Sequence, residues 1–297
     1  MTLSIDDSTA GVLRAFQRGG ISSLVLRGPA LARWLYGPGE RRYYLDADLL
    51  VAPADWDRAQ QVLGELGFVS SGDILPTPWW DAHAVEWIHP AYYGVIDLHY
   101  TLQGAGAEPE RLWSSLAGRT ETLVIDGYPA TALTIPGRAL TLALHACQHA
   151  GGPAVGELGR ALERTDEATW TAAAALAAEV EATDAFATGL RLADGGPELA
   201  DRLGLPSDIP IEIALAPGFG PPGALTIERF AGAGMRQRLA MLRYAVAPPR
   251  AFLRHWLHRE VTTRRTVAGA YAYRAIWLAR RTPRALRAWI RARQAAR

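Results

Sequence analysis

The chain contains no lysine, and all 31 of its basic side chains are arginine. Without a lysine amine, no Schiff base can form on a carbonyl substrate, and the lysine of a P-loop is missing. No glycine-rich segment matches a Walker A or a dinucleotide-binding motif in context. These absences exclude imine chemistry on lysine and the common P-loop and Rossmann modes of phosphate binding.

Cysteines and long apolar runs are also scarce. Cys147 is the single cysteine, so no disulfide can form within the chain, which is typical of a reducing cytoplasm. No uninterrupted apolar stretch reaches the roughly 18 residues that a membrane-spanning helix needs. The first residues include Asp6 and Asp7 and lack the basic-then-apolar pattern of a signal peptide. We therefore expect a cytoplasmic protein without a membrane span.

Charge is distributed unevenly along the 297 residues, although the net charge is only +1. Residues 229–297 hold 17 arginines and one acid, for a net charge of +16, whereas the first 228 residues sum to −15. The basic segment could pack against the acidic body of the chain itself, or it could meet polyphosphate, nucleic acid or an anionic membrane surface. Near its end, after Pro283, the spacing predicts a basic amphipathic helix with an apolar face of Leu286, Trp289 and Ile290.

Three acids stand in hydrophobic, strand-like runs. Asp46 and Asp48 open one run, and Asp97 lies within another. Residues two apart in a strand point to the same face, about 7 Å apart at roughly 3.3 Å per residue. If Asp97 lies on the neighbouring strand, three carboxylates converge, and a hard divalent cation such as Mg²⁺ would offset their repulsion. The alternative is that Asp46 and Asp48 lie in a turn and that Asp97 is a lone surface acid.

A glycine turn precedes these acids. The apolar segment Leu24 to Leu26 leads into Gly28, and Pro29 suits the first turn of a following helix. A strand, a glycine and a helix N-terminus together can bind an anion. The same pattern also fits an ordinary strand–turn–helix connection.

Several motifs occur in an order typical of one family. They are Leu-Arg-Gly-Pro-Ala-Leu-Ala (26–32), Arg42-x-x-x-Asp46-x-Asp48, Asp97-Leu98-His99, the segment 142–149 and Glu-Leu-Gly-Arg-Ala (157–161). In this order the chain resembles the uncharacterised bacterial nucleotidyltransferase family, within the DNA-polymerase-β-like superfamily. The resemblance implies an α+β fold, with a mixed sheet flanked by helices and a mostly helical C-terminal domain. Relatives usually have Gly-Ser or Gly-Gly where this chain has Gly28-Pro29, and Pro29 cannot donate a backbone hydrogen bond.

The resemblance also implies a reaction, metal-dependent transfer of a nucleoside monophosphate from ATP or another nucleoside triphosphate. Mg²⁺ or Mn²⁺ would be held by Asp46, Asp48 and Asp97, and Asp97 could also act as general base. The triphosphate would lie near Gly28. Arginine side chains would neutralise the departing pyrophosphate, and the two expected in this role are Arg27 and Arg42.

Histidines are further candidates for contact with the nucleotide. His99 follows Asp97 by two and would share its face of the strand. His145 and His149 are four apart on one face of a predicted helix, where they could contact phosphate or simply be packed and hydrogen-bonded. The zinc-protease signature is not met, because Ala146 stands where that motif needs glutamate. His83 and His89, in predicted loops, are weaker candidates.

The acceptor is not readable from the residues. Relatives often accompany gene clusters for peptide natural products, which implies a hydroxyl or similar group on a small molecule or peptide. Two alternatives stay open. One is a non-catalytic binding protein that keeps the fold, and the other is a nucleotidyltransferase toxin that modifies tRNA, for which binding should fall steeply with salt.

The periodicity predicts the order of elements. Helices are expected at 8–18, 29–36, 55–66, 139–150, within 167–192 and beyond 228, and strands at 21–26, 43–51, 85–88, 95–100, 123–125 and 130–133. A short strand is expected at 209–215, and Gly195-Gly196-Pro197 is expected to be a loop. We predict a catalytic core at 1–135, a helical domain with a Pro/Gly loop at 136–228 and an Arg-rich helical segment at 229–297.

Overall fold

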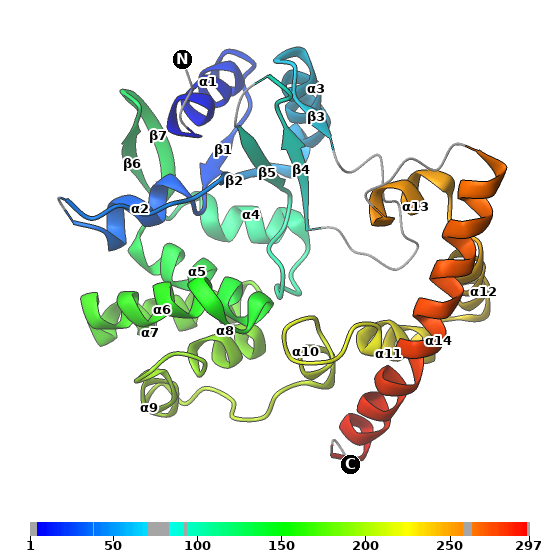
Figure 1. Cartoon of the computed structure of the whole chain (residues 1–297). Helices are drawn as coiled ribbons and strands as arrows, with labels where there is room; N and C mark the ends of the chain where they lie inside the picture. Colours follow the sequence, from blue (N-terminus) through cyan, green and yellow to red (C-terminus); the bar gives the residue numbers. More distant parts are fainter. Residues whose placement is uncertain (1–4, 38, 71–82, 92–93, 258–262, 296–297) are drawn as a thin grey trace. The chain divides into compact units, whose positions relative to one another are not determined.

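The computed structural model describes residues 5–37, 39–70, 83–91, 94–257 and 263–295. These residues form two compact units, one ending at Asp208 and the other beginning at Ile209. The finer division at 135/136 and 228/229 stays a prediction. The first unit (Figure 1) contains α1 (Ile5–Arg18), β1 (Ser23–Val25), α2 (Pro29–Leu35), β2 (Asp46–Val51), η1 (Pro53–Asp55), α3 (Trp56–Glu65), β3 (Val69–Ser70), β4 (Ala84–Ile88), β5 (Val95–His99), α4 (Pro109–Ala117), β6 (Thr120–Ile125), β7 (Tyr128–Leu133), α5 (Ile135–His149), α6 (Gly152–Arg164), α7 (Glu167–Glu179), α8 (Thr183–Leu190) and α9 (Gly196–Arg202).

A mixed sheet is the centre of the first unit. Within the described ranges its seven strands lie in the order β3-β4-β5-β2-β1-β7-β6. The pairs β2–β5 and β1–β7 are parallel, and the other neighbours are antiparallel. The fold class expected from the sequence, a mixed sheet flanked by helices and followed by a helical region, is confirmed.

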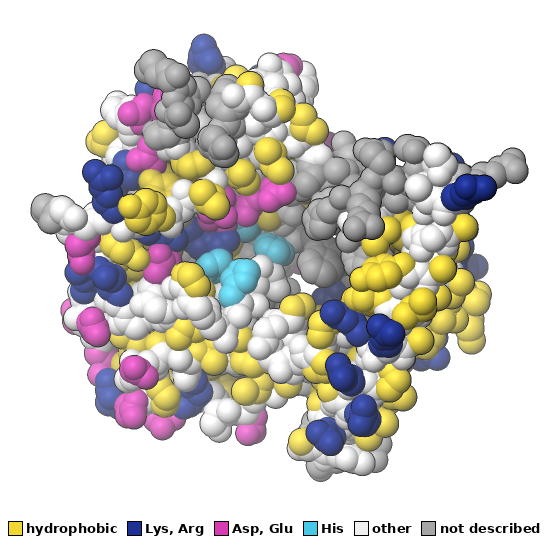
Figure 2. All heavy atoms as spheres, in the orientation of Figure 1, with side chains coloured by type: hydrophobic (Ala, Val, Ile, Leu, Met, Phe, Trp, Pro, Cys, Tyr) yellow, Lys and Arg dark blue, Asp and Glu magenta, His cyan; other side chains and the backbone are white. Residues whose placement is uncertain are grey.

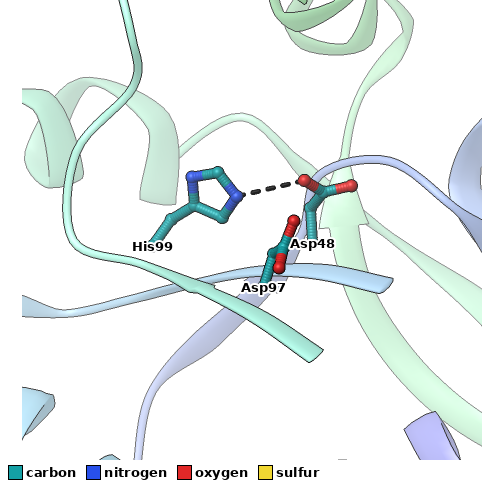
Figure 3. Close-up of side chains that lie close together, drawn as sticks. All are labelled: Asp48, Asp97 and His99. Carbon is teal, nitrogen blue, oxygen red and sulfur yellow. Dashed lines mark hydrogen bonds and ion pairs between the residues drawn. The ribbon is translucent and has the colours of Figure 1, made fainter. Parts of the chain in front are cut away.

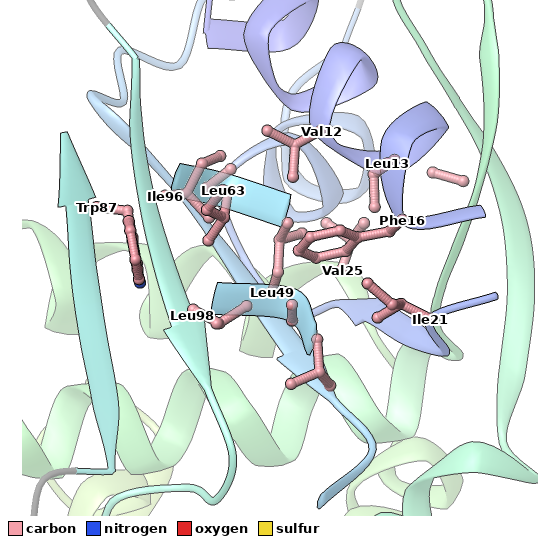
Figure 4. Close-up of a cluster of buried hydrophobic side chains, with 14 of the residues drawn as sticks. Val12, Leu13, Phe16, Ile21, Val25, Leu49, Leu63, Trp87, Ile96 and Leu98 are labelled. Atoms are coloured by element: carbon pink, nitrogen blue, oxygen red, sulfur yellow. The ribbon is translucent and has the colours of Figure 1, made fainter. Parts of the chain in front are cut away.

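One face of the sheet is covered by α1 and α3 and forms the apolar core. Because side chains alternate along a strand, β2 sends Ala47, Leu49 and Val51 to this face, and β5 sends Ile96 and Leu98. They pack with residues of α1 and α3 (Figure 4), including Val12, Phe16 and Leu63. The intervening residues of β2 and β5 therefore point to the opposite face, where polar side chains can gather.

Helix α5 lies at the centre of the helical part of the first unit. It packs against α6, α7 and α8, and its buried residues are apolar or small except for Arg138 and Thr141. The contact with α8 is very close, because a Cβ built on Gly189 would lie 1.9 Å from the carbonyl oxygen of Ala143. Glycine at 189 therefore sets the distance between these two helices.

The second unit consists of helices. They are α10 (Ile211–Ala214), α11 (Ala224–Gly232), α12 (Met235–Val246), α13 (Arg250–Leu257) and α14 (Arg264–Ala295). The strand expected at 209–215 is wrong. The segment forms α10, and Ile211 of this helix and Leu215 at its C-terminal cap, four residues apart, pack in one cluster with Ala285 of α14.

Two further expectations about helix ends are also wrong. Gly196 and Pro197 do not form a loop but open α9, where proline loses no hydrogen bond in the first turn. Pro283 does not start a helix and lies inside α14. Packing on both sides holds this helix through the proline, since Arg274 donates to the carbonyl of Ala245 and Ala285 is buried against α11.

None of the helices in the described ranges combines the length and the apolar character that crossing a bilayer requires.

Replacing Gly189 by alanine is expected to push α8 away from α5 and to lower the free energy of unfolding by about 1–3 kcal/mol or more. Gly159 in α6 is the matched control, because a Cβ there meets nothing within 4 Å. Gly159→Ala should leave stability unchanged or raise it by up to about 1 kcal/mol through helix propensity. Urea unfolding of both variants checks this, and equal stabilities would contradict the close contact.

Candidate active site

The predicted acids meet on the face of the sheet opposite the apolar core. Strands β2 and β5 are parallel neighbours, and their register places Asp48 directly beside Asp97. Asp46 lies beside Val95, at the start of both strands. Figure 3 shows Asp48, Asp97 and His99 gathered on this face. The convergence expected from the alternation of side chains is therefore observed.

Asp48, Asp97 and His99 form a potential metal site. Each offers a ligand atom, and these atoms all lie within 4.8 Å of one another. Two carboxylates suit Mg²⁺ or Mn²⁺, and the imidazole nitrogen is compatible with Mn²⁺ and with softer ions. Among the described residues Asp46 is not a member of this group, although its charge acts on Asp97. The donor chemistry thus fits a divalent cation.

Asp48 is the most strongly held of the three acids. It is buried, forms an ion pair with Arg27, and lies 3.0 Å from Nε2 of His99. Burial alone would raise the pKa of Asp48, but the charge of Arg27 and the hydrogen bond from His99 outweigh it and hold that pKa well below its usual range. Asp48 is therefore ionised at any physiological pH.

Asp97 behaves in the opposite way. The pKa of its carboxyl is raised to about 7, chiefly by burial and then by the negative charges of Asp48 and Asp46. The pKa of Asp46 is raised as well, by burial and by Asp48. Asp48 and Asp97 can therefore have different roles, since Asp48 stays charged while Asp97 exchanges a proton near neutral pH.

The orientation of His99 follows from its partner. An ionised carboxylate only accepts hydrogen bonds, so Nε2 of His99 must carry the proton that faces Asp48. The other ring nitrogen, Nδ1, is buried and has no hydrogen-bond partner among the described residues. While it makes this hydrogen bond, Nε2 of His99 is not available to an ion, and His99 orients Asp48 in the way that outer groups orient metal ligands.

Arg27 connects the sheet to α5. Besides its ion pair with Asp48, its guanidinium donates to Nδ1 of His145. Burial and the charge of Arg27 lower the pKa of His145 to about 2, so this imidazole is neutral. The ring of His149 lies 4.5 Å from that of His145, and burial lowers its pKa too. These histidines are hydrogen-bonding groups beside the acids and not cations.

Gly28 is required by a close approach of two backbone segments. It caps α2 with a φ of +60°, and a Cβ built there would lie 2.8 Å from the carbonyl oxygen of Asp46. Any other residue would therefore push the turn away from the start of β2. Contact of this turn with phosphate stays a prediction.

Arg42 is held by a residue to which the sequence analysis assigned no role. Its guanidinium forms an ion pair with Glu157 of α6 and donates to the carbonyl of Gly28 at 3.2 Å. Both side chains of the pair are largely buried, and Tyr36 also donates to Glu157. The pair thereby ties α6 to the glycine turn. Contact of Arg42 with pyrophosphate stays a prediction.

A small cavity of about 20 Å³ adjoins the acids, enough for about one water molecule. In Figure 2 histidine side chains lie beside acidic and arginine side chains on this part of the surface. His83, predicted to be a weak candidate, lines this cavity, and its ring lies 5.5 Å from that of His99. Burial lowers the pKa of His83 to about 4. The cavity is also lined by three polar residues that were not predicted to be site residues, namely Gln103, Thr141 and Gln148.

Comparison with known proteins identifies a family for most of this unit. The model of a family described as uncharacterised nucleotidyltransferase matches residues 2–195. No curated protein matches the chain.

Solved structures show distant similarity. The lincosamide antibiotic adenylyltransferase LnuA, bound to lincomycin, is 14% identical with a TM-score of 0.38, over 56% of this chain and 100% of its own. The antibiotic-resistance factor ANT(2'')-Ia is 14% identical with a TM-score of 0.42, over 60% and 95%. An antigenic nucleotidyltransferase-like protein from Paracoccidioides brasiliensis is 15% identical with a TM-score of 0.37, over 60% and 92%.

The raised pKa of Asp97 predicts a pH-dependent cost to stability. Between pH values of about 4 and 7 the folded protein binds a proton at Asp97 that the unfolded chain releases, so the free energy of unfolding falls as pH rises. In Asp97→Asn the side chain no longer ionises, so the free energy of unfolding should no longer fall with pH on account of this residue. In urea unfolding with EDTA, the variant should be more stable than the wild type by on the order of 2–4 kcal/mol at pH 8 and nearly equal to it at pH 4. A variant that is less stable at both pH values would contradict the argument.

Glu157→Gln is expected to destabilise the protein, because it leaves the buried guanidinium of Arg42 without its anion. We expect a loss of about 1–3 kcal/mol in urea unfolding. Glu40 provides the control, since it pairs with Arg160 and Arg164 at a more exposed position. Glu40→Gln should cost less than about 1 kcal/mol. Similar losses in the two variants would show that burial of the Arg42 pair does not matter.

Proposed function

The chain belongs to the uncharacterised nucleotidyltransferase family and is a nucleotidyltransferase, and we propose that it moves AMP from ATP to a hydroxyl of a small molecule or peptide. The observation that supports this reaction is the register of β2 and β5. It brings Asp48 and Asp97 side by side, with Arg27 next to them. Phosphoryl transfer commonly uses carboxylates that hold metal ions and cationic side chains that offset the charge of the phosphates.

We propose that Asp48 and Asp97 hold Mg²⁺ or Mn²⁺ together with the triphosphate, with Asp46 as a further ligand. Such an ion would supply positive charge against the phosphate oxygens and lower the pKa of the acceptor hydroxyl. His99 keeps Asp48 in position through its hydrogen bond. Arg27 is paired with Asp48, and in this proposal its charge also acts on the triphosphate.

In the proposed reaction the acceptor oxygen forms a bond to the α-phosphorus, and the bond from that phosphorus to the bridging oxygen of the β-phosphate breaks. In this proposal the acceptor proton passes to Asp97, the carboxylate that lies directly beside Asp48 in the register of β2 and β5. Pyrophosphate departs with its charge offset by Arg27 and, in this proposal, by Arg42. The turn at Gly28 and the neutral His145 and His149 complete the phosphate side of the site.

Nucleotide binding tests the proposal independently of the unknown acceptor. In calorimetry, a non-hydrolysable ATP analogue should bind only with Mg²⁺ or Mn²⁺, and Asp48→Asn should weaken that binding at least about tenfold because a charged ligand is lost. Mg²⁺ with the analogue should also raise the melting temperature of the wild type and not that of the variant. Asp57→Asn, an exposed acid of α3, should behave as the wild type.

The outcomes separate the alternatives. If the ATP analogue binds equally well without metal and to the Asp48→Asn variant, the enzyme proposal is contradicted and a non-catalytic binding protein is favoured. Incubation with labelled nucleoside triphosphates and candidate acceptors, followed by intact mass, should show the gain of one nucleoside monophosphate. A gain of one phosphate would instead indicate a kinase. Label on tRNA, with binding that falls steeply as salt rises, would favour the nucleic-acid enzyme.

A further inference from the structure

An apolar stripe lies on the surface of α12 in the second unit. Met235, Leu239, Leu242 and Val246 are 70%, 60%, 51% and 74% exposed, although their side chains are large and apolar. Their spacing of four, three and four residues places them within about 60° on one side of a helix with 3.6 residues per turn. We name these four residues the α12 stripe. Contiguous exposed apolar surface of this kind marks a site that meets an apolar partner.

The opposite side of α12 accounts for the stability of the helix. Met241 and Tyr244 are buried there, and the ring of Tyr244 packs edge-on against Phe252 of α13. Arg274 of α14 donates to the carbonyl of Ala245 at 2.9 Å. The helix therefore does not need the α12 stripe to remain folded within its unit.

Two arginines lie beside the α12 stripe, along the same edge. Arg236 and Arg243 lie about 70–90° round the helix from the centre of the stripe, are exposed, and make no ion pair with any described residue. The C-terminal segment that holds α12 is strongly basic, because residues 209–297 contain 17 arginines and three acids. One of those acids, Glu228, is already paired with Arg293. Figure 2 shows apolar and arginine side chains next to one another on this unit.

From this combination we propose that the α12 stripe docks on an anionic lipid surface, with the apolar side chains among the acyl chains and Arg236 and Arg243 at the headgroups. An anionic bilayer offers an apolar layer directly beneath negative charge, which is the arrangement that the helix complements. Nucleic acid fits less well, since it would leave four aliphatic side chains without a stacking or hydrogen-bonding partner. A second copy would bring like charges together. The inference does not depend on the proposed function.

Co-sedimentation of the full-length protein with vesicles tests the proposal. The protein should bind vesicles of phosphatidylcholine with one quarter phosphatidylglycerol at least about tenfold more tightly than pure phosphatidylcholine, and the binding should weaken as salt rises. The double variant Leu239→Gln with Leu242→Gln should lose at least about tenfold in binding. Both positions are exposed, so circular dichroism and melting temperature should not change.

The control variant is Val69→Gln with Val124→Gln, two apolar residues of the first unit that are 60% and 59% exposed. It should bind as the wild type. Several results would overturn the proposal. They are no binding to the anionic vesicles, equal binding to pure phosphatidylcholine, or unchanged binding in the Leu239→Gln, Leu242→Gln variant. A dimer that disappears in that variant, or RNA binding that depends on the same leucines, without vesicle binding, would assign the stripe to a different partner.

Discussion

Arg27 pairs with Asp48 at the point where the carboxylates of β2 and β5 come together. Without this cation, Asp46, Asp48 and Asp97 would repel one another in a partly buried site, where charge is costly. Because a guanidinium keeps its charge at any physiological pH, Asp48 stays ionised and the repulsion raises the pKa values of Asp97 and Asp46. The ion pair of Arg27 with Asp48 thus gives Asp48 and Asp97 opposite pKa shifts, although the two residues lie side by side on neighbouring strands.

The helical part of the first unit holds this ion pair in place. Helix α5 presents His145 to the guanidinium of Arg27, and α6 presents Glu157 to Arg42, which in turn binds the carbonyl of Gly28. The glycine turn is thereby fixed between the start of β2 and two helices. The tight contact of α5 with α8 at Gly189 keeps α5 itself at a defined distance. The acids belong to the sheet, but their surroundings are built by the helices that follow it.

The sequence was informative where a pattern is local. Alternation along β2 and β5 predicted that Asp46, Asp48 and Asp97 share a face, and the order of motifs predicted the nucleotidyltransferase family, which is confirmed. Pairings between distant segments left no local signal, as for Glu157 with Arg42, 115 residues apart. The strand expected at 209–215 was wrong because alternating isoleucines also fit a short helix that packs on one side. The helix start expected after Pro283 was wrong because tertiary packing maintains α14 through a residue that would otherwise interrupt a helix.

The pairing of β1 with β2 has a consequence for synthesis of the chain. Arg27 lies two residues past the end of β1, and Asp48, on the antiparallel neighbour β2, is only 21 residues away in the chain. His99 follows Asp48 by 51 residues, and His145 follows Arg27 by 118. Since a chain emerges from the ribosome with its N-terminal part first, the cation can meet Asp48 before β5 brings the next carboxylate. We expect Arg27 to pair with Asp48 in the nascent protein before Asp97 arrives. The parallel pairing of β2 with β5 would then bring Asp97 beside an aspartate whose charge is already offset.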